Sequence, residues 1–331
     1  MQTEKTVRSV IITGGNSGLG FSAATALLRY KQAWHVIIAC RDQERGASAV
    51  KKLSRIGSGN VEAISLALAS LASIRAFTNT IEQRLSAGDL PPLYSVICNA
   101  GTQGATKFTV DGFESTFGVN HLGHYLLVNL LLPLLAKPTR IVVIASGVHD
   151  PVQLDAVPMA TVPAPAWNTP MELSKGNLGI EASNDDETAD MGRRYATSKL
   201  ANMYFTYGLA SRLPEGITVN AFDPGLMPGT GLAREYSPVM RFMWYRIMPH
   251  MLTVMRLLIK NVHTSKESGA SLARLVTDPE LVGTNGKYYE GMKEIPSSKA
   301  SYDVNSADEL WDDSAVLTGL TEPNASTNSS R

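Results

Sequence analysis

The chain has 331 residues, of which 44% are hydrophobic, so it is long and apolar enough to bury the core of a full α/β domain. Thirty basic residues balance thirty acidic ones, which argues against nucleic acid or an anionic membrane as the main partner. Only Cys40 and Cys98 are present, both in apolar runs, and this excludes a disulfide framework and predicts a reducing, cytoplasmic location.

Short β-branched runs alternate with helical patterns along most of the chain. Six or seven strands are expected, from runs at residues 10–12, 35–40, 61–68, 94–99, 140–145, 218–222 and 287–289. The continuous apolar run at 141–144 is typical of a parallel strand covered on both faces. The pattern predicts one doubly wound, Rossmann-type α/β domain over residues 1–320 with a mostly parallel sheet. Its ligands should bind beyond the carboxyl ends of the strands.

Three segments interrupt this alternation. Residues 150–190 contain five prolines and an acidic run, and they are predicted to be an irregular insertion. Residues 236–262 carry apolar side chains at helical spacing, with Pro249 dividing two short helices. This second segment suits a substrate lid, a core element, or a peripheral membrane contact through Arg241, Arg246, Arg256 and Lys260. The polar residues 321–331 are predicted to be disordered. No run is long and apolar enough to predict a membrane span, and no signal-peptide pattern precedes the first strand.

A glycine-rich turn follows the first predicted strand and opens a helical pattern. Such a turn lets the backbone approach a pyrophosphate, while the helix N-terminus offers unpaired N–H groups. The alternative is a purely structural turn. The candidate cofactor-binding residues here are Gly14, Asn16, Ser17, Gly18, Leu19 and Gly20.

The end of the second predicted strand bears on the choice of cofactor. An acidic residue there would bind the ribose 2′-hydroxyl of NAD, but the strand ends in Cys40 followed by Arg41. An arginine can bind a 2′-phosphate through two hydrogen bonds, so NADP(H) is favoured. Asp42 could contact the ribose instead, or it could cap the next helix.

Tyr195 and Lys199 are four residues apart and share one helix face. A nearby ammonium stabilises the phenolate and brings the pKa of the tyrosine toward neutrality, which would make the phenol a usable proton donor. An exposed helix carrying the same two residues by chance is the alternative. His121, His124 and His149 lack the Cys or carboxylate spacing of a metal site, so no metal is predicted.

In this order, the glycine turn, an Asn-Ala-Gly turn, an Asn, a Ser and the Tyr-Lys pair resemble the short-chain dehydrogenase/reductase family. The branch is similar to retinol-dehydrogenase-like and protochlorophyllide-reductase-like enzymes. The resemblance implies that the cofactor is bound by Asn99, Ala100, Gly101, Pro224, Gly225 and Thr230, together with Tyr195 and Lys199. It implies a catalytic set of Asn120, Ser146, Tyr195 and Lys199. Thr230 could equally be an ordinary loop cap.

The chain departs from the family pattern at two places. Ala67 stands where the family usually has an Asp that contacts adenine, which puts cofactor affinity in question. The insertion before Tyr195 lengthens the gap from Ser146 and could set part of the substrate specificity. The resemblance also allows a homodimer through two long helices, predicted at Phe113–Ala136 and Arg193–Leu213.

These features together predict an NADP(H)-dependent oxidoreductase that interconverts a carbonyl group and an alcohol. The small-molecule substrate should be fairly large and apolar, as in secondary metabolism, and reduction is the expected direction. The resemblance gives Tyr195 the role of proton donor, Ser146 that of hydrogen-bonding the substrate oxygen, and Asn120 that of holding a water near Lys199. Two alternatives stay open: a light-dependent protochlorophyllide-type reductase, and a non-catalytic NADP-binding scaffold or redox sensor.

Overall fold

The computed structural model describes residues 7–57, 59–104, 106–152, 162–180, 187–231, 238–259 and 261–320. The tail at 321–331, predicted to be disordered, lies outside these residues, as do Lys260 and two parts of the insertion, 153–161 and 181–186.

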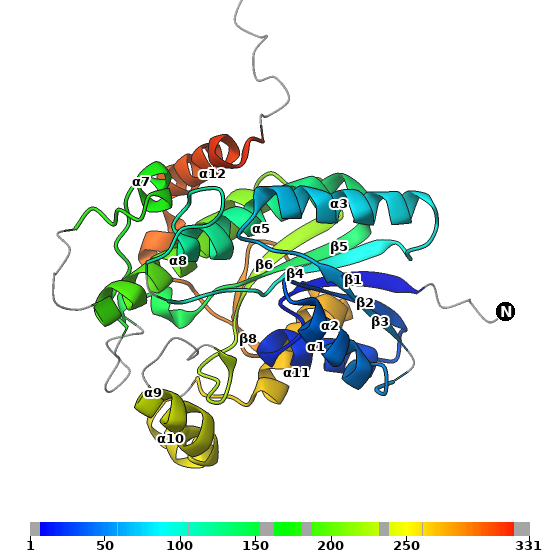
Figure 1. The fold of residues 1–331 in the computed structure, drawn as a ribbon, viewed down its shortest axis with the longest axis horizontal. Helices are drawn as coiled ribbons and strands as arrows, with labels where there is room; N and C mark the ends of the chain where they lie inside the picture. Colours follow the sequence, from blue (N-terminus) through cyan, green and yellow to red (C-terminus); the bar gives the residue numbers. More distant parts are fainter. Residues whose placement is uncertain are drawn as a thin grey trace, which may run out of the picture.

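A single sheet of eight strands runs through the described chain, in the order β3-β2-β1-β4-β5-β6-β7-β8 (Figure 1). The strands are β1 (Arg8–Thr13), β2 (Trp34–Cys40), β3 (Asn60–Ser65), β4 (Leu93–Cys98), β5 (Leu135–Ile144), β6 (Ile217–Asp223), β7 (Tyr288–Glu290) and β8 (Lys293–Glu294). Every pair from β3 to β7 is parallel, and β8 adds an antiparallel edge. The doubly wound Rossmann-type sheet is therefore confirmed. It has one strand more than predicted, because β8 is two residues long and leaves no periodic pattern.

Helices cover both faces of this sheet (Figure 1). The first layer consists of α1 (Gly18–Leu28), α2 (Gln43–Leu53) and α11 (Ser265–Thr277). The second consists of α3 (Leu71–Ser86), α5 (Gly123–Leu131) and α8 (Glu187–Ala210). Outside α8 lie α12 (Val304–Thr318) and the short α7 (Pro170–Ser174), which belongs to the insertion.

The apolar strands divide their side chains between the two helical layers. In β1, Ile11 joins a core with Phe77 of α3 and Phe205 of α8, whereas its neighbour Ile12 joins a core with Leu27 of α1 and Leu272 of α11. Successive strand residues point to opposite faces, so a strand buried on both faces must be apolar at every position. This is why the central runs are continuous in the sequence.

Three predicted boundaries were wrong. The first long helix, predicted at Phe113–Ala136, is divided into α4 (Ser115–Phe117), a π-helical turn at Gly118–Leu122, α5, and a 3-10 turn at Leu132–Leu134. Pro133 lies in that last turn, and a proline lacks the N–H that would continue an α-helix, so β5 already begins at Leu135. The second long helix runs over Glu187–Ala210, and β3 ends at Ser65 instead of Leu68.

α12 covers the outer face of α8, one of the two helices expected at a dimer interface. Trp311 of α12 stacks on Phe205 with ring centroids 6.2 Å apart and meets Tyr125 edge-on at 5.1 Å. Arg212, just beyond α8, lies over the Trp311 ring and pairs with Asp308 at 2.8 Å. A homodimer through these helices would therefore have to pack against α12.

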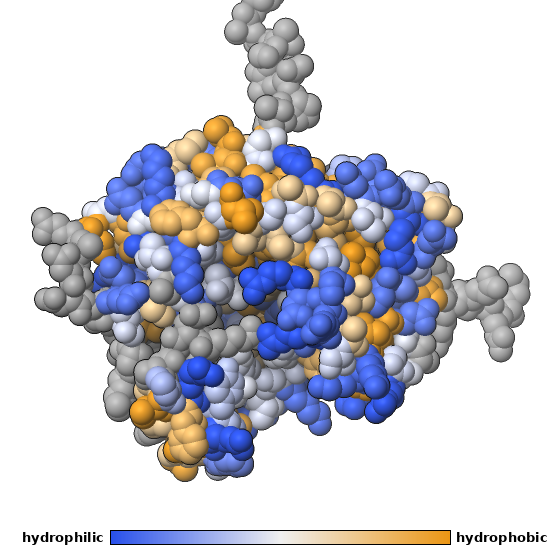
Figure 2. All heavy atoms as spheres, viewed as in Figure 1, coloured by the Kyte–Doolittle hydropathy of each residue, from blue (hydrophilic) through white to orange (hydrophobic). Residues whose placement is uncertain are grey.

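The predicted lid consists of α9 (Pro238–Phe242), a π-helical turn at Met243–Ile247, a 3-10 turn at Met248–His250 and α10 (Leu252–Leu258). Pro249 separates the two helices as predicted, and the pair projects from the body of the molecule (Figure 1). Among the lid side chains whose burial the structure describes, Trp244 is the one large apolar side chain that is buried, whereas Phe242 is 61% and Leu257 is 83% exposed. The core interpretation of this segment was therefore wrong, and Figure 2 shows its apolar surface at the lower left. Within the described chain, none of the helices has the length and apolar character needed to cross a membrane.

Candidate active site

The glycine turn and the Asn-Ala-Gly turn meet at the carboxyl ends of β1 and β4. The hydroxyl of Thr13 accepts hydrogen bonds from the backbone N–H groups of Asn99 and Ala100, both at 2.9 Å. The Asn99 side-chain amide donates in return to the Thr13 carbonyl at 2.7 Å. These bonds bring two predicted cofactor-binding motifs, 86 residues apart in sequence, into one continuous surface.

The glycines of the first turn have different physical roles. A Cβ at Gly15 would lie 2.5 Å from the Ile38 side chain, and one at Gly20 would lie 2.6 Å from the Asn99 amide, so both are needed for close packing. Gly18 has a φ of +55° and nothing within 4 Å of its Cβ position. Its open surface at the start of α1 leaves room for a ligand next to the helix N-terminus, which suits a cofactor phosphate.

A cleft of about 400 Å³ opens between the start of α1 and the lid. It is lined by Ser17, Gly18, Phe21, Ser22, Arg45, Gly229, Thr230, Gly231, Tyr245 and Ser265. Of these, Ser17, Gly18 and Thr230 were predicted site residues, whereas Phe21, Ser22, Arg45, Gly229, Gly231, Tyr245 and Ser265 were not. Arg45 could have been suspected from the sequence, because it is a second basic residue shortly after the end of β2.

Arg41 and Asp42 end the loop between β2 and α2. Arg41 is exposed, and no ion pair to it or to Arg45 is found within the described ranges. Asp42 accepts a hydrogen bond from the Arg45 backbone N–H at 3.0 Å and so caps α2. The helix-cap interpretation of Asp42 is thus confirmed, and the Arg45 side chain lines the cleft.

Ala67 lies in the turn after β3. Its backbone N–H donates to the Ser73 hydroxyl at 3.0 Å, and its carbonyl accepts from the Ser70 N–H. The backbone N–H of Ala67 is therefore already used within the protein.

Tyr195 and Lys199 lie on α8, with the Lys199 ammonium 5.4 Å from the centre of the Tyr195 ring. Lys199 is 3% exposed and donates to the Ile144 carbonyl, at the end of β5, at 2.9 Å. Burial lowers the pKa of Lys199 to about 8, against the opposing effect of the Asp223 carboxylate. The amine is thus close to its titration point at physiological pH.

Ser146 follows β5, two residues after the carbonyl that binds Lys199. Its backbone is extended, with a φ of −172°, and a 3-10 turn at Gly147–His149 begins immediately after it. The Ser146 carbonyl accepts a hydrogen bond of 2.6 Å from Nδ1 of the buried His149. This bond closes the turn after Ser146, and the turn packs against α8, the helix that carries Tyr195.

Asn120 lies in the π-helical turn before α5 and joins two parts of the site. Its side-chain oxygen accepts from the Thr102 N–H at 2.7 Å, and its amide donates to the Thr102 carbonyl and to the Ser198 hydroxyl, both at 3.0 Å. The Ser198 hydroxyl in turn donates to the Tyr195 carbonyl at 2.7 Å. Asn120 thus connects the end of the Asn-Ala-Gly turn with the helix that carries Tyr195.

His121 and His124 point to different parts of the core. His124 bonds to the Thr13 hydroxyl through Nε2 at 2.9 Å and to the Asn120 carbonyl through Nδ1 at 3.1 Å, whereas His121 bonds to Ser314 of α12 at 2.7 Å. Burial lowers the pKa of His121 to about 3 and that of His124 to about 4, so both are neutral. Within the described ranges no three His, Cys, Asp or Glu side chains are grouped as metal ligands.

The turn after β6 brings Pro224, Gly225 and Thr230 to the same end of the sheet. Gly225 has a φ of +72°, and a Cβ there would overlap the Asn261 side chain. The Thr230 hydroxyl donates to the Met227 carbonyl at 2.9 Å, which is the loop-cap arrangement, and its own carbonyl accepts from the Trp244 indole at 2.9 Å. The Trp244 bond holds the lid to the cleft wall.

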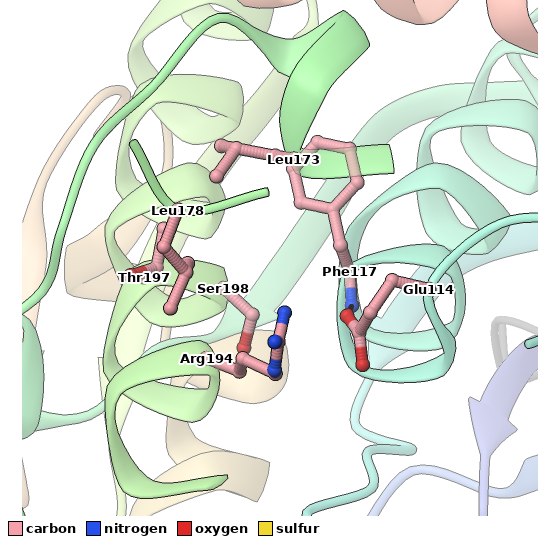
Figure 3. A pocket seen from close by; sticks show the side chains of 7 residues that line it. All are labelled: Glu114, Phe117, Leu173, Leu178, Arg194, Thr197 and Ser198. Carbon is pink, nitrogen blue, oxygen red and sulfur yellow. Dashed lines mark hydrogen bonds between the residues drawn. The ribbon is translucent and has the colours of Figure 1, made fainter. Parts of the chain in front are cut away.

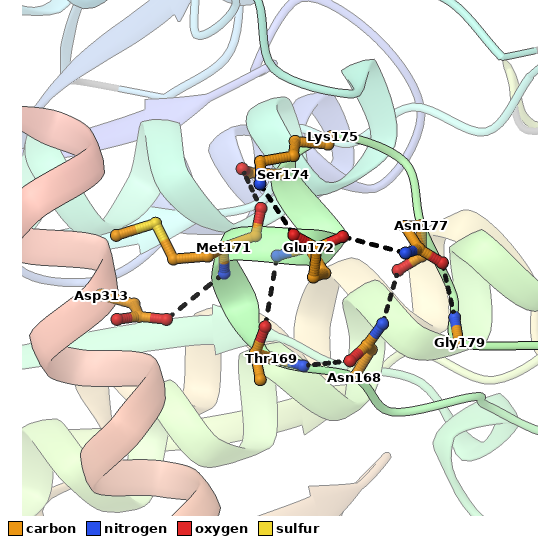
Figure 4. Close-up of polar contacts among 9 residues, drawn as sticks. All are labelled: Asn168, Thr169, Met171, Glu172, Ser174, Lys175, Asn177, Gly179 and Asp313. Carbon is orange, nitrogen blue, oxygen red and sulfur yellow. Dashed lines mark hydrogen bonds and ion pairs between the residues drawn. The ribbon is translucent and has the colours of Figure 1, made fainter.

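The described part of the insertion, 162–180, packs against α8 next to Tyr195. The Thr197 hydroxyl exchanges hydrogen bonds with the backbone of Ala166, and the Glu172 carboxylate accepts from Lys175 at 2.7 Å and Asn177 at 2.9 Å (Figure 4). A small cavity of about 10 Å³, enough for one water molecule, lies between α4, α7 and α8. The side chains of Glu114, Phe117, Leu173, Leu178, Arg194, Thr197 and Ser198 surround it (Figure 3).

The similarity of the chain to known proteins agrees with this geometry. The sequence profile of the family described as short chain dehydrogenase matches residues 8–154. Retinol dehydrogenase 14 of Homo sapiens is 34% identical over 333 residues, which cover 95% of this chain and 87% of that protein. Protochlorophyllide reductase A of Oryza sativa subsp. japonica is 33% identical over 344 residues, covering 96% and 82%.

The chain belongs to the short-chain dehydrogenase family. It lies in the branch of that family that contains retinol-dehydrogenase-like and protochlorophyllide-reductase-like proteins. It is accordingly an oxidoreductase that uses a nicotinamide cofactor. Among solved structures, an uncharacterized protein from Mycobacterium paratuberculosis has a TM-score of 0.65 at 26% identity, covering 94% of this chain and 93% of that one. The RhlG–NADP complex of Pseudomonas aeruginosa has a TM-score of 0.58 at 24% identity, covering 85% and 93%, and shares the fold.

Proposed function

We propose that this short-chain dehydrogenase is an NADP(H)-dependent reductase of a carbonyl group on a fairly large, apolar small molecule. The proposal is carried by one observation: Tyr195 and the buried Lys199 lie at the end of β5 that also bears Ser146, on the same sheet edge as the glycine turn. A phenol, an ammonium and a hydroxyl are the groups that proton transfer to a carbonyl oxygen requires.

Each of the four predicted catalytic residues has a distinct part in this proposal. Tyr195 gives its phenolic proton to the carbonyl oxygen, while the Ser146 hydroxyl donates a hydrogen bond to that oxygen as negative charge develops. The Lys199 ammonium stabilises the phenolate that remains, and a proton from solvent then restores the phenol. Asn120 holds the helix that carries Tyr195 in place relative to the cofactor surface, through its hydrogen bond to Ser198. When bound, the cofactor supplies the hydride that the carbonyl carbon gains.

The cofactor surface is proposed to consist of the two turns and the loop after β6. Backbone groups from Gly14 to Gly20 and from Asn99 to Gly101 would hold the phosphates and a ribose, with Pro224, Gly225 and Thr230 at the nicotinamide end. Arg41 supports the choice of NADP(H), and Arg45 on the cleft wall adds a second cation for a 2′-phosphate. Replacing both arginines by alanine should weaken NADPH binding at least tenfold and leave NADH binding nearly unchanged, which fluorescence titration measures.

The lid supports the choice of an apolar substrate. It exposes Met240, Met243 and Met251 near the cleft that Tyr245 lines, and methionine adapts to irregular apolar ligands. Together with the described part of the insertion, which lies against α8 beside Tyr195, it would enclose a bulky substrate.

The lid also keeps open the proposal of a peripheral membrane contact. Residues 238–259 include Arg241, Arg246 and Arg256 and no acidic residue, next to the exposed apolar side chains. Sedimentation with neutral and anionic vesicles tests this, and equal recovery in the supernatant would exclude it.

Three further predictions stay as predictions: a cytoplasmic location, a single domain over 1–320 and a homodimer. Light scattering measures the last of these.

The decisive experiment is turnover of a carbonyl panel with NADPH by the wild type and Tyr195→Phe. Loss of a single hydroxyl should lower kcat about 10²- to 10⁴-fold while NADPH binding is retained. Equal turnover by the two proteins would refute the proposed mechanism. Unchanged biological activity of a Tyr195→Phe protein that binds NADPH would instead favour the scaffold alternative.

A protochlorophyllide-type activity is the second candidate, because of the 33% identity to such reductases. The resemblance implies a cysteine near the pocket, but Cys40 and Cys98 are both buried, and neither lines the cleft. Illumination of the protein with NADPH and protochlorophyllide tests this directly. Formation of chlorophyllide would establish the alternative.

A further inference from the structure

Asp223, at the end of β6, is a buried carboxylate to which the family pattern assigns no role here. Its side chain is 2% exposed and accepts four hydrogen bonds. Oδ1 accepts from the Gly225 N–H at 2.9 Å. Oδ2 accepts from the Gly147 N–H at 2.9 Å, the Asn261 amide at 3.0 Å and the Tyr288 hydroxyl at 3.3 Å.

These donors belong to the segments that surround the proposed reacting atoms. Gly147 directly follows Ser146, and Gly225 lies in the turn proposed to hold the nicotinamide end of the cofactor. The two oxygens of one carboxylate therefore set the position of the Ser146 loop relative to that turn. Asn261 and Tyr288 donate to the same carboxylate, and the Asn261 side chain also lies against Gly225.

The charge of Asp223 is not neutralised by an ion pair within the described ranges. Its ionisable neighbours are Lys199 from α8, His149 from the 3-10 turn, and Tyr288 and Glu290 from β7. Glu290 pairs with Asp223 in the sheet register. The pKa of Glu290 is raised, mainly by burial and in addition by the negative charge of Asp223. Burial lowers the pKa of His149, which favours its neutral form.

Lys199 is thus the basic side chain whose charge the Asp223 carboxylate stabilises. Lys199 donates to the carbonyl of Ile144, which pairs in register with Phe222, the residue before Asp223. The ionisable groups that face Lys199 are Tyr195 on its own helix, His124 from α5 and Asp223 from β6. Asp223 is the only carboxylate of the three.

We propose that Asp223 is a positioning residue of the reductase site, one that fixes the Ser146 loop against the Gly225 turn and places its negative charge on the Lys199 side of the site. The inference rests on the proposed function, because it concerns the surroundings of the Lys199 ammonium that this function requires.

The proposal predicts a change in the pH profile that a purely structural role would not produce. Burial already lowers the pKa of Lys199 to about 8, and loss of the neighbouring negative charge would lower it further. The ammonium form would then be lost at a lower pH, so the alkaline limb of kcat/KM should move to lower pH. A residue that only fixed loops would lower kcat/KM by the same factor at every pH.

Asp223→Asn is the variant that removes the charge and keeps the shape. We expect the alkaline limb of kcat/KM for NADPH-dependent reduction to shift down by about one pH unit. Tyr288→Phe is the matched control, because it removes one donor to the same carboxylate and leaves its charge, and its profile should coincide with that of the wild type. Asp223→Glu keeps the charge but displaces the carboxylate from its donors, so it should lower kcat/KM while shifting the limb by less than Asp223→Asn does.

Each outcome decides the matter. An unshifted limb in folded Asp223→Asn, or an equal shift in Tyr288→Phe, would overturn the proposal. Should Asp223→Asn not fold, Asp223→Ser replaces it; failure of both to fold while Tyr288→Phe folds would assign Asp223 to folding alone and also overturn it. Failure of the proposed function is separate, because it would appear as full turnover by Tyr195→Phe at every pH.

Discussion

Two helical glycines should respond in opposite directions to the same substitution. Gly269 lies in α11 where this helix crosses α1, and a Cβ there would be 2.5 Å from Ser22 Cβ, 2.6 Å from the Ser22 carbonyl carbon and 2.9 Å from the Ala23 nitrogen. Carbon atoms in contact are normally about 3.5–4.0 Å apart, so the two helices would have to separate by roughly 1 Å. Gly208 lies in α8, and its Cβ would meet its nearest neighbours at 3.6 Å, an ordinary contact.

The magnitudes follow from these contacts. Replacing glycine by alanine inside a helix gains about 0.8–1.0 kcal/mol, and this gain applies at both positions. Overpacking costs about 1–3 kcal/mol, and we take the upper end for Gly269 because two of the three overlapping atoms are backbone. Gly269→Ala should therefore lose about 2 kcal/mol, or about 3 °C in Tm, whereas Gly208→Ala should gain up to about 1 kcal/mol.

Thermal and urea unfolding of the two variants beside the wild type measures this difference. Because α1 carries the glycine turn, Gly269→Ala should also weaken NADPH binding, and Gly208→Ala should not. The reasoning is refuted if Gly269→Ala is as stable as the wild type, since the helices would then be free to separate without cost.

Three further predictions concern stability and the lid. Lys199→Met should abolish most turnover yet stabilise the protein by up to about 3 kcal/mol at pH 7, because the folded pKa of about 8 lies below the unfolded value near 10.5. The wild type bears the full free-energy cost of the buried ammonium below pH 8 and loses that cost as the pH rises toward 10.5. The gain in Tm of Lys199→Met should therefore shrink over that range, and a gain that stays constant with pH would contradict this prediction. Trp244→Ala removes the bond to Thr230 and should raise KM for apolar carbonyls with little change in Tm, and equal KM values would show that the lid does not contact substrate. Trp311→Ala should lose about 3–5 kcal/mol in urea unfolding, because it empties the contact between α12 and α8; a loss below 1 kcal/mol would argue that α12 docks only loosely.

Much of the sheet and of the site could be predicted because their signals are local. A strand buried on both faces must be apolar at each position, so the runs at Val10 and Ile141 identify central strands without knowledge of their neighbours. The spacing of Tyr195 and Lys199 places both on one helix face for the same reason. The glycine turn follows its strand directly, and its function depends on that order. The failed boundaries, at Leu135 and at the end of β3, lie where a turn competes with a continuing helix or strand.

The tertiary structure alone decided which distant segments meet. Asp223 is one acidic residue after a strand in the sequence, and only the packing of β5, β6 and the loop at Asn261 gives it four donors and Lys199 as a neighbour. Arg45 reaches the cleft because α2 lies next to α1, and the apolar residues of the lid are exposed because no other element covers them within the described chain. Periodicity shows that a segment has an apolar face, but not what covers that face. The sequence by itself therefore determined the elements and the order of the motifs, whereas contacts between residues far apart along the chain set the charge and shape of the site.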